Sequence, residues 1–378
     1  MKRRLIIITE IISPYRIPLF NALAQHPDLN LHVIFLGEND PNLRKWRVYK
    51  EEIRFSFQVL RSWRKRLGRY NALLNVGVAS ALAQVKPDVI LCGGYSYLAS
   101  WVALGWARKH AVPFLLWSES NQQDQRRGFL VTEFLKRQFL RRCDRFVVPG
   151  QSAGEYLSKL NIPEDRISIA PNAVDNCLFG VAADVARKKA GELRNALGLP
   201  SRYYLFVGRL VREKGIFDLL TAYQRISHDL RSQIGLVFVG DGPCKSELQQ
   251  KASEITGGSI RVVDFVQRDE LGAFYGLAET FVLPTYTDTW GMVVNEAMAC
   301  GLPVIVSNAA GCAADLVREN WNGLSVKAGD IDGLSSAMTR LGQDVNLRQQ
   351  MEANSAAQIL GYSPEVWATS VDAAVRNL

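Results

Sequence analysis

The chain has 378 residues, of which 48% are hydrophobic and 22% are charged, and its formal net charge is +8. At roughly 150 residues per domain this length favours two folded domains, and the near-average composition excludes disorder, collagen-like repeats and a coiled coil. The six cysteines and four histidines are scattered without a C-x-x-C pair, which excludes both a zinc site and a disulfide framework.

Short β-branched runs alternate with helical patterns in the first half of the chain, which is typical of parallel α/β layers. The expected strands are residues 5–9, 31–36, 89–93, 114–118, 145–149 and 167–170. The expected helices between them are residues 18–25, 70–84 and 129–142.

A polar, charge-rich segment from residue 175 to residue 202 precedes a second series of such elements. Its expected strands, each followed by a turn and a helix, are residues 203–207, 236–239, 261–265, 281–284 and 304–307. We therefore predict two doubly wound domains, residues 1–175 and 200–362, with a last helix at about 363–378 that packs back on the first domain. Two facing sheets of this kind would place a substrate cleft between the domains.

The charge is divided unevenly along the chain. Residues 1–175 carry a net charge of +11 and residues 176–378 carry −3. A basic half indicates an anionic partner, and the lack of a nucleic-acid reading motif turns the prediction towards a membrane surface. Two segments, residues 61–69 and 129–142, interleave basic with apolar side chains as interfacial segments do. An ordinary amphipathic helix explains the second segment equally well.

A glycine and two cations follow the first strand of the second series. Gly208 and Arg209 end the strand, and Lys214 stands just before a helix that starts near Ile216. The start of a helix offers unpaired N–H groups to an anion, although a solvated charged turn explains this segment by itself. A second turn, Gly240-Asp241-Gly242-Pro243, lacks a third glycine and is expected to be a plain strand-to-helix turn.

The most informative segment runs from Pro284 to Val306 and parses as strand end, loop, apolar helix and new strand. The helix carries Glu296, and a buried carboxylate needs hydrogen-bond donors such as ribose hydroxyls or backbone N–H groups. Asp288 stands eight residues earlier, at about 12 Å if the whole segment were helical. That separation disfavours a carboxylate pair acting on one bond and suits the two ends of one long ligand.

Together these motifs resemble the C-terminal signature of the retaining glycosyltransferases of family 4, which have the GT-B fold of two facing Rossmann-like domains. The motifs that carry the resemblance are, in chain order, Gly208-Arg209-Leu210, Glu213-Lys214-Gly215, Val239-Gly240-Asp241-Gly242-Pro243, Glu296-Ala297-Met298-Ala299, Gly301-Leu302-Pro303-Val304-Ile305 and Asn322-Gly323. Jointly and in this order they are highly specific.

The resemblance implies a donor site in the second domain. In the family, the residues matching Arg209 and Lys214 bind the donor diphosphate, and the residue matching Glu296 binds the ribose hydroxyls. The first carboxylate of the family's E-x7-E pattern holds the transferred sugar, and this chain has Asp288 there, one methylene shorter. The expected donor-binding set is completed by Gly208, Trp290, Gly291, Met292 and Val293.

The acceptor side departs from the family pattern. Residues 12–20 stand where many relatives have a glycine pair after the first strand. Glu119 occupies about the place where relatives carry a His or Asp that faces the sugar. Glu119 is therefore the candidate acceptor-orienting or proton-handling carboxylate, and the cap of a loop explains it equally well.

The resemblance implies a retaining, metal-independent glycosyltransferase that uses a nucleotide diphosphate sugar, with a UDP-sugar preferred to a GDP-sugar. No cofactor is expected, since Arg209, Lys214 and a helix terminus suit the charge of a leaving diphosphate, and the D-x-D at Asp330 and Asp332 reads as a helix cap. The expected partners are the donor, a carbohydrate or lipid-linked acceptor in envelope glycan synthesis and an anionic membrane, at the cytoplasmic face. The alternatives are an epimerase or phosphorylase of the same fold and a non-catalytic nucleotide-sugar-binding subunit.

Overall fold

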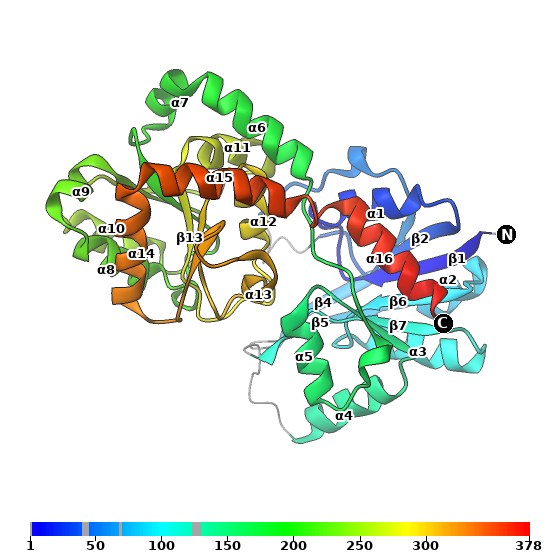
Figure 1. The fold of residues 1–378 in the computed structure, drawn as a ribbon. Helices are drawn as coiled ribbons and strands as arrows, with labels where there is room; N and C mark the ends of the chain where they lie inside the picture. Colours follow the sequence, from blue (N-terminus) through cyan, green and yellow to red (C-terminus); the bar gives the residue numbers. More distant parts are fainter. Residues whose placement is uncertain (1, 40–44, 68–69, 123–129) are drawn as a thin grey trace. The chain divides into compact units, whose positions relative to one another are not determined.

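The computed structural model describes residues 2–39, 45–67, 70–122 and 130–378. The chain forms two compact units, the first containing residues up to 173 together with 364–378 and the second containing residues 174–363. Each unit has its own parallel β-sheet (Figure 1). Within the described residues, no helix is both long enough and apolar enough to cross a membrane.

The first unit is built on seven parallel strands in the order β3-β2-β1-β6-β7-β8-β9. Their bounds are β1 Arg3–Thr9, β2 Leu29–Phe35, β3 Ser56–Val59, β6 Val89–Gly93, β7 Phe114–Trp117, β8 Arg145–Val148 and β9 Ile167–Ile169. The order runs outward from β1 in both directions, which is a doubly wound arrangement. Six of these strands were predicted within two residues, and the largely exposed edge strand β3 was missed.

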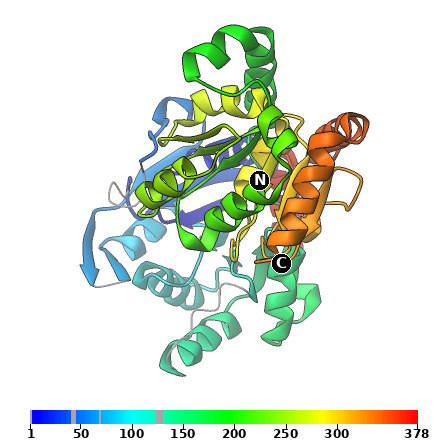
Figure 2. The ribbon, with the colours of Figure 1, turned by 90° about the vertical axis from the view of Figure 1, so that its left-hand side faces the viewer.

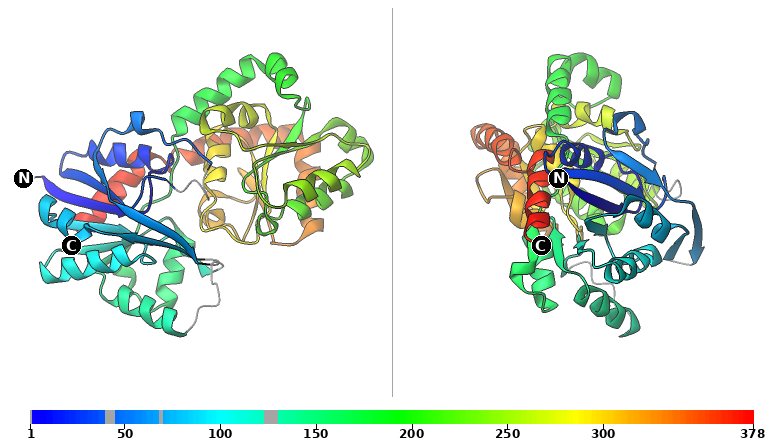
Figure 3. Two further views of the ribbon diagram at one scale, coloured as in Figure 1. Left: turned by 180° about the vertical axis from the view of Figure 1, so that it is seen from behind. Right: turned by 90° about the vertical axis from the view of Figure 1, so that its right-hand side faces the viewer.

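Helices cover both faces of this sheet because alternate residues of β1 enter two different apolar cores. Leu5 and Ile7 pack with α1 and α16, and Ile6 and Ile8 pack with α2, α3, α4 and α5. The bounds are α1 Ile17–Ala24, α2 Val78–Val85, α3 Leu98–Lys109, α4 Leu130–Arg141, α5 Gln151–Lys159 and α16 Pro364–Arg376. Helices α1 and α16 lie side by side (Figures 1 and 3).

The helix expected at residues 70–84 is wrong in its first half. Residues Tyr70–Asn75 form strand β5, which pairs antiparallel with β4 (Ser62–Leu67), and the helix begins only at Val78. Leu73 enters the apolar core, while Trp63 on β4 is 61% exposed. The expected basic segment 61–69 is thus largely strand β4, and its residues 68 and 69 lie outside the described residues. The six-residue runs on either side of Gly68 are the hairpin signal that helical periodicity obscured.

The second unit has six parallel strands in the order β12-β11-β10-β13-β14-β15. Their bounds are β10 Tyr203–Val207, β11 Gly235–Val239, β12 Ile260–Val263, β13 Thr280–Leu283, β14 Val304–Ser307 and β15 Gly323–Val326. All residues of β10, β11, β13 and β14 are buried. The five predicted strands are present, and β15 was missed because its four residues carry no long apolar run.

The helices of the second unit fall into two groups. Helix α8 packs against α10 and α14, whereas α11 and α12 both pack against α6; Figure 2 shows α14, in orange, beside the sheet. The bounds are α6 Asn176–Lys188, α7 Ala190–Leu197, α8 Ile216–Arg225, α9 His228–Gln233, α10 Lys245–Ser253, α11 Arg268–Leu277, α12 Met292–Ala299, α13 Ala313–Leu316, α14 Ile331–Gln343 and α15 Val345–Ile359. The charge-rich segment at 175–202 is therefore mostly helical and belongs to the second unit.

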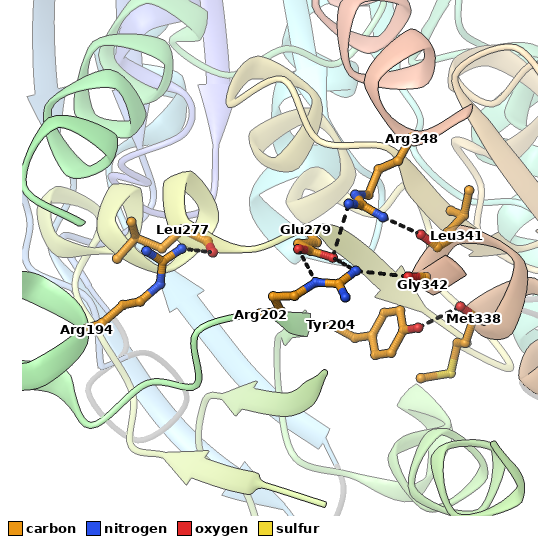
Figure 4. A network of polar contacts seen from close by, with 9 residues as sticks. All are labelled: Arg194, Arg202, Tyr204, Leu277, Glu279, Met338, Leu341, Gly342 and Arg348. Carbon is orange, nitrogen blue, oxygen red and sulfur yellow. Dashed lines mark hydrogen bonds and ion pairs between the residues drawn. The ribbon is translucent and has the colours of Figure 1, made fainter. Parts of the chain in front are cut away.

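A polar network ties α14 and α15 to the amino-terminal edge of this sheet (Figure 4). Arg202 binds Glu279 through two hydrogen bonds of 2.7 and 2.9 Å, and Arg348 lies 3.6 Å from the same carboxylate. The two arginines also donate to the carbonyl oxygens of Gly342 and Leu341. Because a half-buried carboxylate between two guanidinium groups is well satisfied, this edge has a structural role.

Candidate functional site

Two glycine turns lock together at the carboxyl edge of the second unit's sheet. A Cβ on Gly240 would lie 1.9 Å from the carbonyl oxygen of Gly208, and one on Gly242 would lie 2.4 Å from that of Leu210. The N–H of Leu210 donates to the carbonyl oxygen of Asp241 at 2.9 Å. The turn at 240–243 was expected to be a plain strand-to-helix turn. In the structure it also supports the loop from Gly208 to Leu210, which carries Arg209.

The two predicted phosphate-binding cations have different surroundings. Arg209 is exposed, and within the described part of the chain its guanidinium has no ion-pair or side-chain hydrogen-bond partner. Lys214 ends the short 3-10 turn Arg212–Lys214 and is half-buried, with its Nζ ion-paired to Asp288 and 3.4 Å from the carbonyl oxygen of Thr287. The structure thus joins Lys214 to the residue predicted to hold the transferred sugar.

A close backbone approach holds these two segments together. Gly215 has φ +68°, and a Cβ there would lie 2.0 Å from the carbonyl oxygen of Pro284. The carbonyl oxygen of Glu213 accepts hydrogen bonds from the N–H of Tyr286 at 2.8 Å and from the hydroxyl of Thr285 at 3.0 Å. Only glycine fits this left-handed position beside a carbonyl group, so Gly215 brings Lys214 to the 284–288 loop.

Asp288 lies where this loop turns into α12. One carboxylate oxygen pairs with Lys214, and the other accepts the backbone N–H of Trp290 at 3.2 Å. The indole of Trp290 is buried and donates to Asn295 at 2.8 Å, and its carbonyl oxygen accepts the N–H of Cys312 at 2.9 Å. Gly291 caps α12 with φ +102°, and Met292 and Val293, both half-buried, form the first turn of that helix.

Glu296 is fully buried on α12 and accepts a 2.6 Å hydrogen bond from the hydroxyl of Tyr275 on α11. The donors predicted from the sequence were ribose hydroxyls and backbone N–H groups. This phenol was not among them, because nothing in a spacing of 21 residues indicates the contact. Glu296 therefore has a protein donor of its own, and its ribose role stays a prediction. A carboxylate held this way is ordered before any ligand arrives.

Two buried thiols lie beside the carboxylates of the site. Burial, and then the charge of Glu296, raises the pKa of Cys300, while burial and then Asp288 raises the pKa of Cys312 well above its usual value. A thiol with a raised pKa stays protonated at neutral pH and is a poor nucleophile. These cysteines therefore contribute packing to the site.

Glu119, the predicted acceptor-side carboxylate, belongs to the first unit. It pairs with Arg16 and accepts a 3.1 Å hydrogen bond from Asn172, and Arg16 in turn donates to Asn172 at 2.9 Å. The guanidinium of Arg16 lies 4.1 Å from the ring centroid of Trp117. In the sequence, the segment that contains Arg16 is notable only as a departure from the family pattern, and Asn172 was not among the predicted site residues.

The D-x-D at residues 330–332 caps a helix, as expected. The side chain of Asp330 accepts the backbone N–H of Gly333 at 2.9 Å at the start of α14. Within the described ranges, no three His, Cys, Asp or Glu side chains are grouped closely enough to hold a metal ion.

Two family models match the chain. Residues 19–176 match the model described as Glycosyltransferase Family 4, and residues 191–358 match the model described as Glycosyl transferases group 1. Together they account for most of both units.

Among curated relatives, TuaC of Bacillus subtilis (strain 168), assigned to teichuronic acid biosynthesis as a glycosyltransferase, is 40% identical over 39% of this chain and 36% of its own. An O-antigen chain mannosyltransferase B of Escherichia coli is 30% identical over 43% of this chain and 42% of its own. The chain thus spans well under two thirds of the length of either relative.

Among solved structures, the Anabaena protein Alr3699/HepE in complex with UDP and glucose is similar over 100% of both chains, with a TM-score of 0.76 and 16% identity. A sucrose-phosphate synthase from Thermosynechococcus elongatus is similar over 99% of this chain and 98% of its own chain, with a TM-score of 0.74 and 20% identity. These likenesses extend over both units and concern the fold, which confirms the prediction of an α/β chain with two parallel-sheet, Rossmann-like units.

Proposed function

Because the chain belongs to the family 4 glycosyltransferases of GT-B fold, we propose that it transfers a sugar, with retention, from a nucleotide diphosphate sugar to an acceptor hydroxyl in lipid-linked or envelope glycan synthesis. The observation that carries the proposal is the ion pair of Lys214 with Asp288, in which Lys214 stands on the same β10–α8 connection as the exposed Arg209. It gathers two cations and a carboxylate at the carboxyl edge of one sheet, where open α/β sheets bind ligands. The names of TuaC and the O-antigen mannosyltransferase support an envelope glycan as product.

The main requirement of the proposed reaction is stabilisation of the leaving group. The bond from the sugar's anomeric carbon to the diphosphate breaks, the acceptor oxygen bonds to that carbon on the same face, and the acceptor's proton leaves with the nucleoside diphosphate. Charge develops on the departing phosphate, and Arg209 and Lys214 would stabilise it. Asp288 would hold the sugar and Glu296 the ribose hydroxyls, so one loop and one helix serve both ends of the donor.

The proposal includes no metal and no cofactor. Two cations and the N-terminal turn of α8, which begins at Ile216, would supply the positive charge that a divalent ion would otherwise provide. We infer UDP as the preferred nucleotide, and the solved structure of HepE with UDP and glucose supports this choice.

A membrane surface is the proposed partner of the first unit. On α4, Phe134 is 60% and Leu135 is 45% exposed, and the basic side chains of Arg137 and Arg141 are exposed beside them. Apolar side chains next to cations suit the interface of an anionic leaflet, to which each cation contributes about 1 kcal/mol. The proposed location is therefore peripheral, at the cytoplasmic face of the membrane, with a carbohydrate or lipid-linked acceptor.

Nucleotide binding and turnover test the enzymatic proposal. A ligand of the folded state raises its melting temperature, so a panel of UDP, GDP and their sugars should identify the donor by thermal unfolding. Release of the nucleotide from that donor then separates an enzyme from a binding subunit. If no nucleotide raises the melting temperature, the proposed function is wrong.

Sedimentation with vesicles tests the membrane proposal. Phosphatidylglycerol vesicles should bind the protein at low salt, phosphatidylcholine vesicles should not, and salt should weaken the binding by screening. Replacing Arg137 and Arg141 with Gln should abolish sedimentation, whereas replacing the exposed Lys188 and Lys189 of the second unit, with the same loss of charge, should not. A wild-type protein that stays in the supernatant contradicts a membrane partner.

A further inference from the structure

Three side chains from different strand ends meet at the carboxyl edge of the first unit's sheet. Arg16 follows β1, Glu119 follows β7 and Asn172 follows β9. Each of the three bonds to the other two, at 2.9 Å for Arg16 to Asn172, 3.1 Å for Asn172 to Glu119, and through the Arg16–Glu119 ion pair. The carboxyl ends of parallel strands are where open α/β sheets bind ligands.

Only one oxygen of the Glu119 carboxylate takes part in the hydrogen bonds with Arg16 and Asn172. Oε1 accepts both the guanidinium of Arg16 and the amide of Asn172. For the described residues, Oε2 has no hydrogen-bond partner in the protein, and the side chain stays 35% exposed. Glu119 thus has one anchored oxygen and one oxygen that remains able to accept a hydrogen bond.

The anchor itself is rigid. Asn172 is 1% exposed and the side chain of Arg16 is 18% exposed. The Arg16 guanidinium lies 4.1 Å from the ring centroid of Trp117, which limits its rotation by stacking. A planar guanidinium can bridge an amide oxygen and a carboxylate at the same time, which an ammonium group cannot do in the same geometry. The direction of the Glu119 carboxylate therefore depends on Arg16.

We propose that Arg16 is a positioning residue for the acceptor: it holds Glu119 so that Oε2 accepts a hydrogen bond from a hydroxyl of the acceptor sugar. The inference rests on the proposed function, since it assumes a sugar acceptor at this edge. The proposed function makes the ligand class a glycoside, whose hydroxyls can donate to the carboxylate oxygen. In this proposal Arg16 acts through Glu119.

The test compares transfer to a sugar with transfer to water. Release of the nucleotide from the preferred donor is measured in buffer alone and with octyl glucoside, galactoside, mannoside and N-acetylglucosaminide as acceptors. Arg16→Met and Glu119→Gln should each lower kcat/KM for the best glycoside by about tenfold or more, mainly through KM. Release in water and the affinity for UDP should stay within about twofold.

The double variant separates a positioning role from a structural one. If Arg16 acts through Glu119, Arg16→Met should have little further effect in the Glu119→Gln background, and Arg16→Lys should recover part of the loss. Arg4→Met is the matched control, since it removes an arginine–aspartate pair with Asp88 at the other end of β1. It should leave transfer unchanged. Thermal unfolding shows whether each variant folds. If Arg16→Met does not fold, the same kinetic comparison is made with Glu119→Gln and Arg16→Lys.

Several results would overturn the inference. If the losses of kcat/KM in the two single variants multiply in the double variant, Arg16 does not act through Glu119. If each variant slows nucleotide release in water as much as transfer to glycosides, the network has only a structural role. Release in water that no glycoside accelerates would show that Glu119 does not face a sugar hydroxyl, while the donor half of the proposed function stands. A wild-type protein that neither binds nor cleaves any nucleotide sugar refutes the proposed function itself, and the inference with it.

Discussion

A single methyl group at residue 215 should disable the donor side of the second unit. Gly215 has φ +68°, and the Cβ of an alanine there would lie 2.0 Å from the carbonyl oxygen of Pro284 and 2.8 Å from its carbon. The left-handed backbone costs an alanine about 1 to 2 kcal/mol, and overpacking adds about 1 to 3 kcal/mol. Because Cβ contacts below 3.0 Å do not persist, the two backbones must separate by about 1 Å.

That movement acts on everything that joins the two segments. The hydrogen bonds from Thr285 and Tyr286 to Glu213 lengthen, and the ion pair of Lys214 with Asp288 loses its geometry. A misplacement of about 1 Å in positioned groups can cost about a hundredfold in rate. We therefore expect Gly215→Ala to lower the melting temperature, to weaken UDP binding and to reduce turnover by about a hundredfold.

Calorimetry with UDP, thermal unfolding and nucleotide release measure the three effects. Gly191→Ala is the matched control in the same unit, because Gly191 lies in α7 and a Cβ there meets nothing within 4 Å. This control should bind UDP like the wild type and gain about 0.5 to 1 kcal/mol of stability. Wild-type UDP affinity and melting temperature in Gly215→Ala would refute the argument that this glycine sets the position of Lys214.

Five further substitutions probe the second unit. Glu296→Gln should weaken UDP binding by about 1.5 to 3 kcal/mol in calorimetry without unfolding the protein, and an unchanged affinity would remove Glu296 from the site. Arg209→Ala and Lys214→Ala should each reduce turnover by about a hundredfold or more, while a chelator has little effect; activity that follows added metal instead would contradict the metal-free mechanism. Asp288→Ala should harm transfer and discrimination between donor sugars more than UDP binding, and equal losses would assign it to the nucleotide end. Glu279→Gln should lower the free energy of unfolding by about 1 to 3 kcal/mol with UDP affinity unchanged, since that network lies at the opposite edge of the sheet.

Most of the fold could be predicted because the buried strands carry their own signal. Continuous apolar runs such as Tyr203–Val207 and Val304–Ser307 have the predicted bounds, since a strand buried on both faces must be apolar throughout. The hairpin at Ser62–Asn75 was mistaken in part for a helix. Its strands carry charged and polar residues, and Leu73 packs in the apolar core that contains Ile6 and Ile8, a tertiary contact that local periodicity does not contain.

The site could be predicted only to the level of segments. The motifs at Lys214 and Asp288 were recognised separately, but their ion pair depends on a backbone approach between segments 74 residues apart. The hydroxyl of Tyr275 that binds Glu296, and the anchoring of Glu119 by Arg16, likewise depend on which strand ends and helices meet in space. Sequence motifs identify chemically suitable residues, and the topology decides which of them touch.

The division of the first unit between two distant stretches of chain has a consequence for biosynthesis. Trp367 on α16 is fully buried, with ring centroids 5.9 Å from Phe20 and 5.2 Å from Trp117, and α16 belongs to the core that α1 forms. A ribosome adding roughly 5 to 20 residues per second needs about 10 to 40 s to make the 190 residues of the second unit. Until α16 has been made, the nascent first unit exposes the apolar face that α16 will cover, and transiently exposed apolar surface of this kind is what chaperones protect.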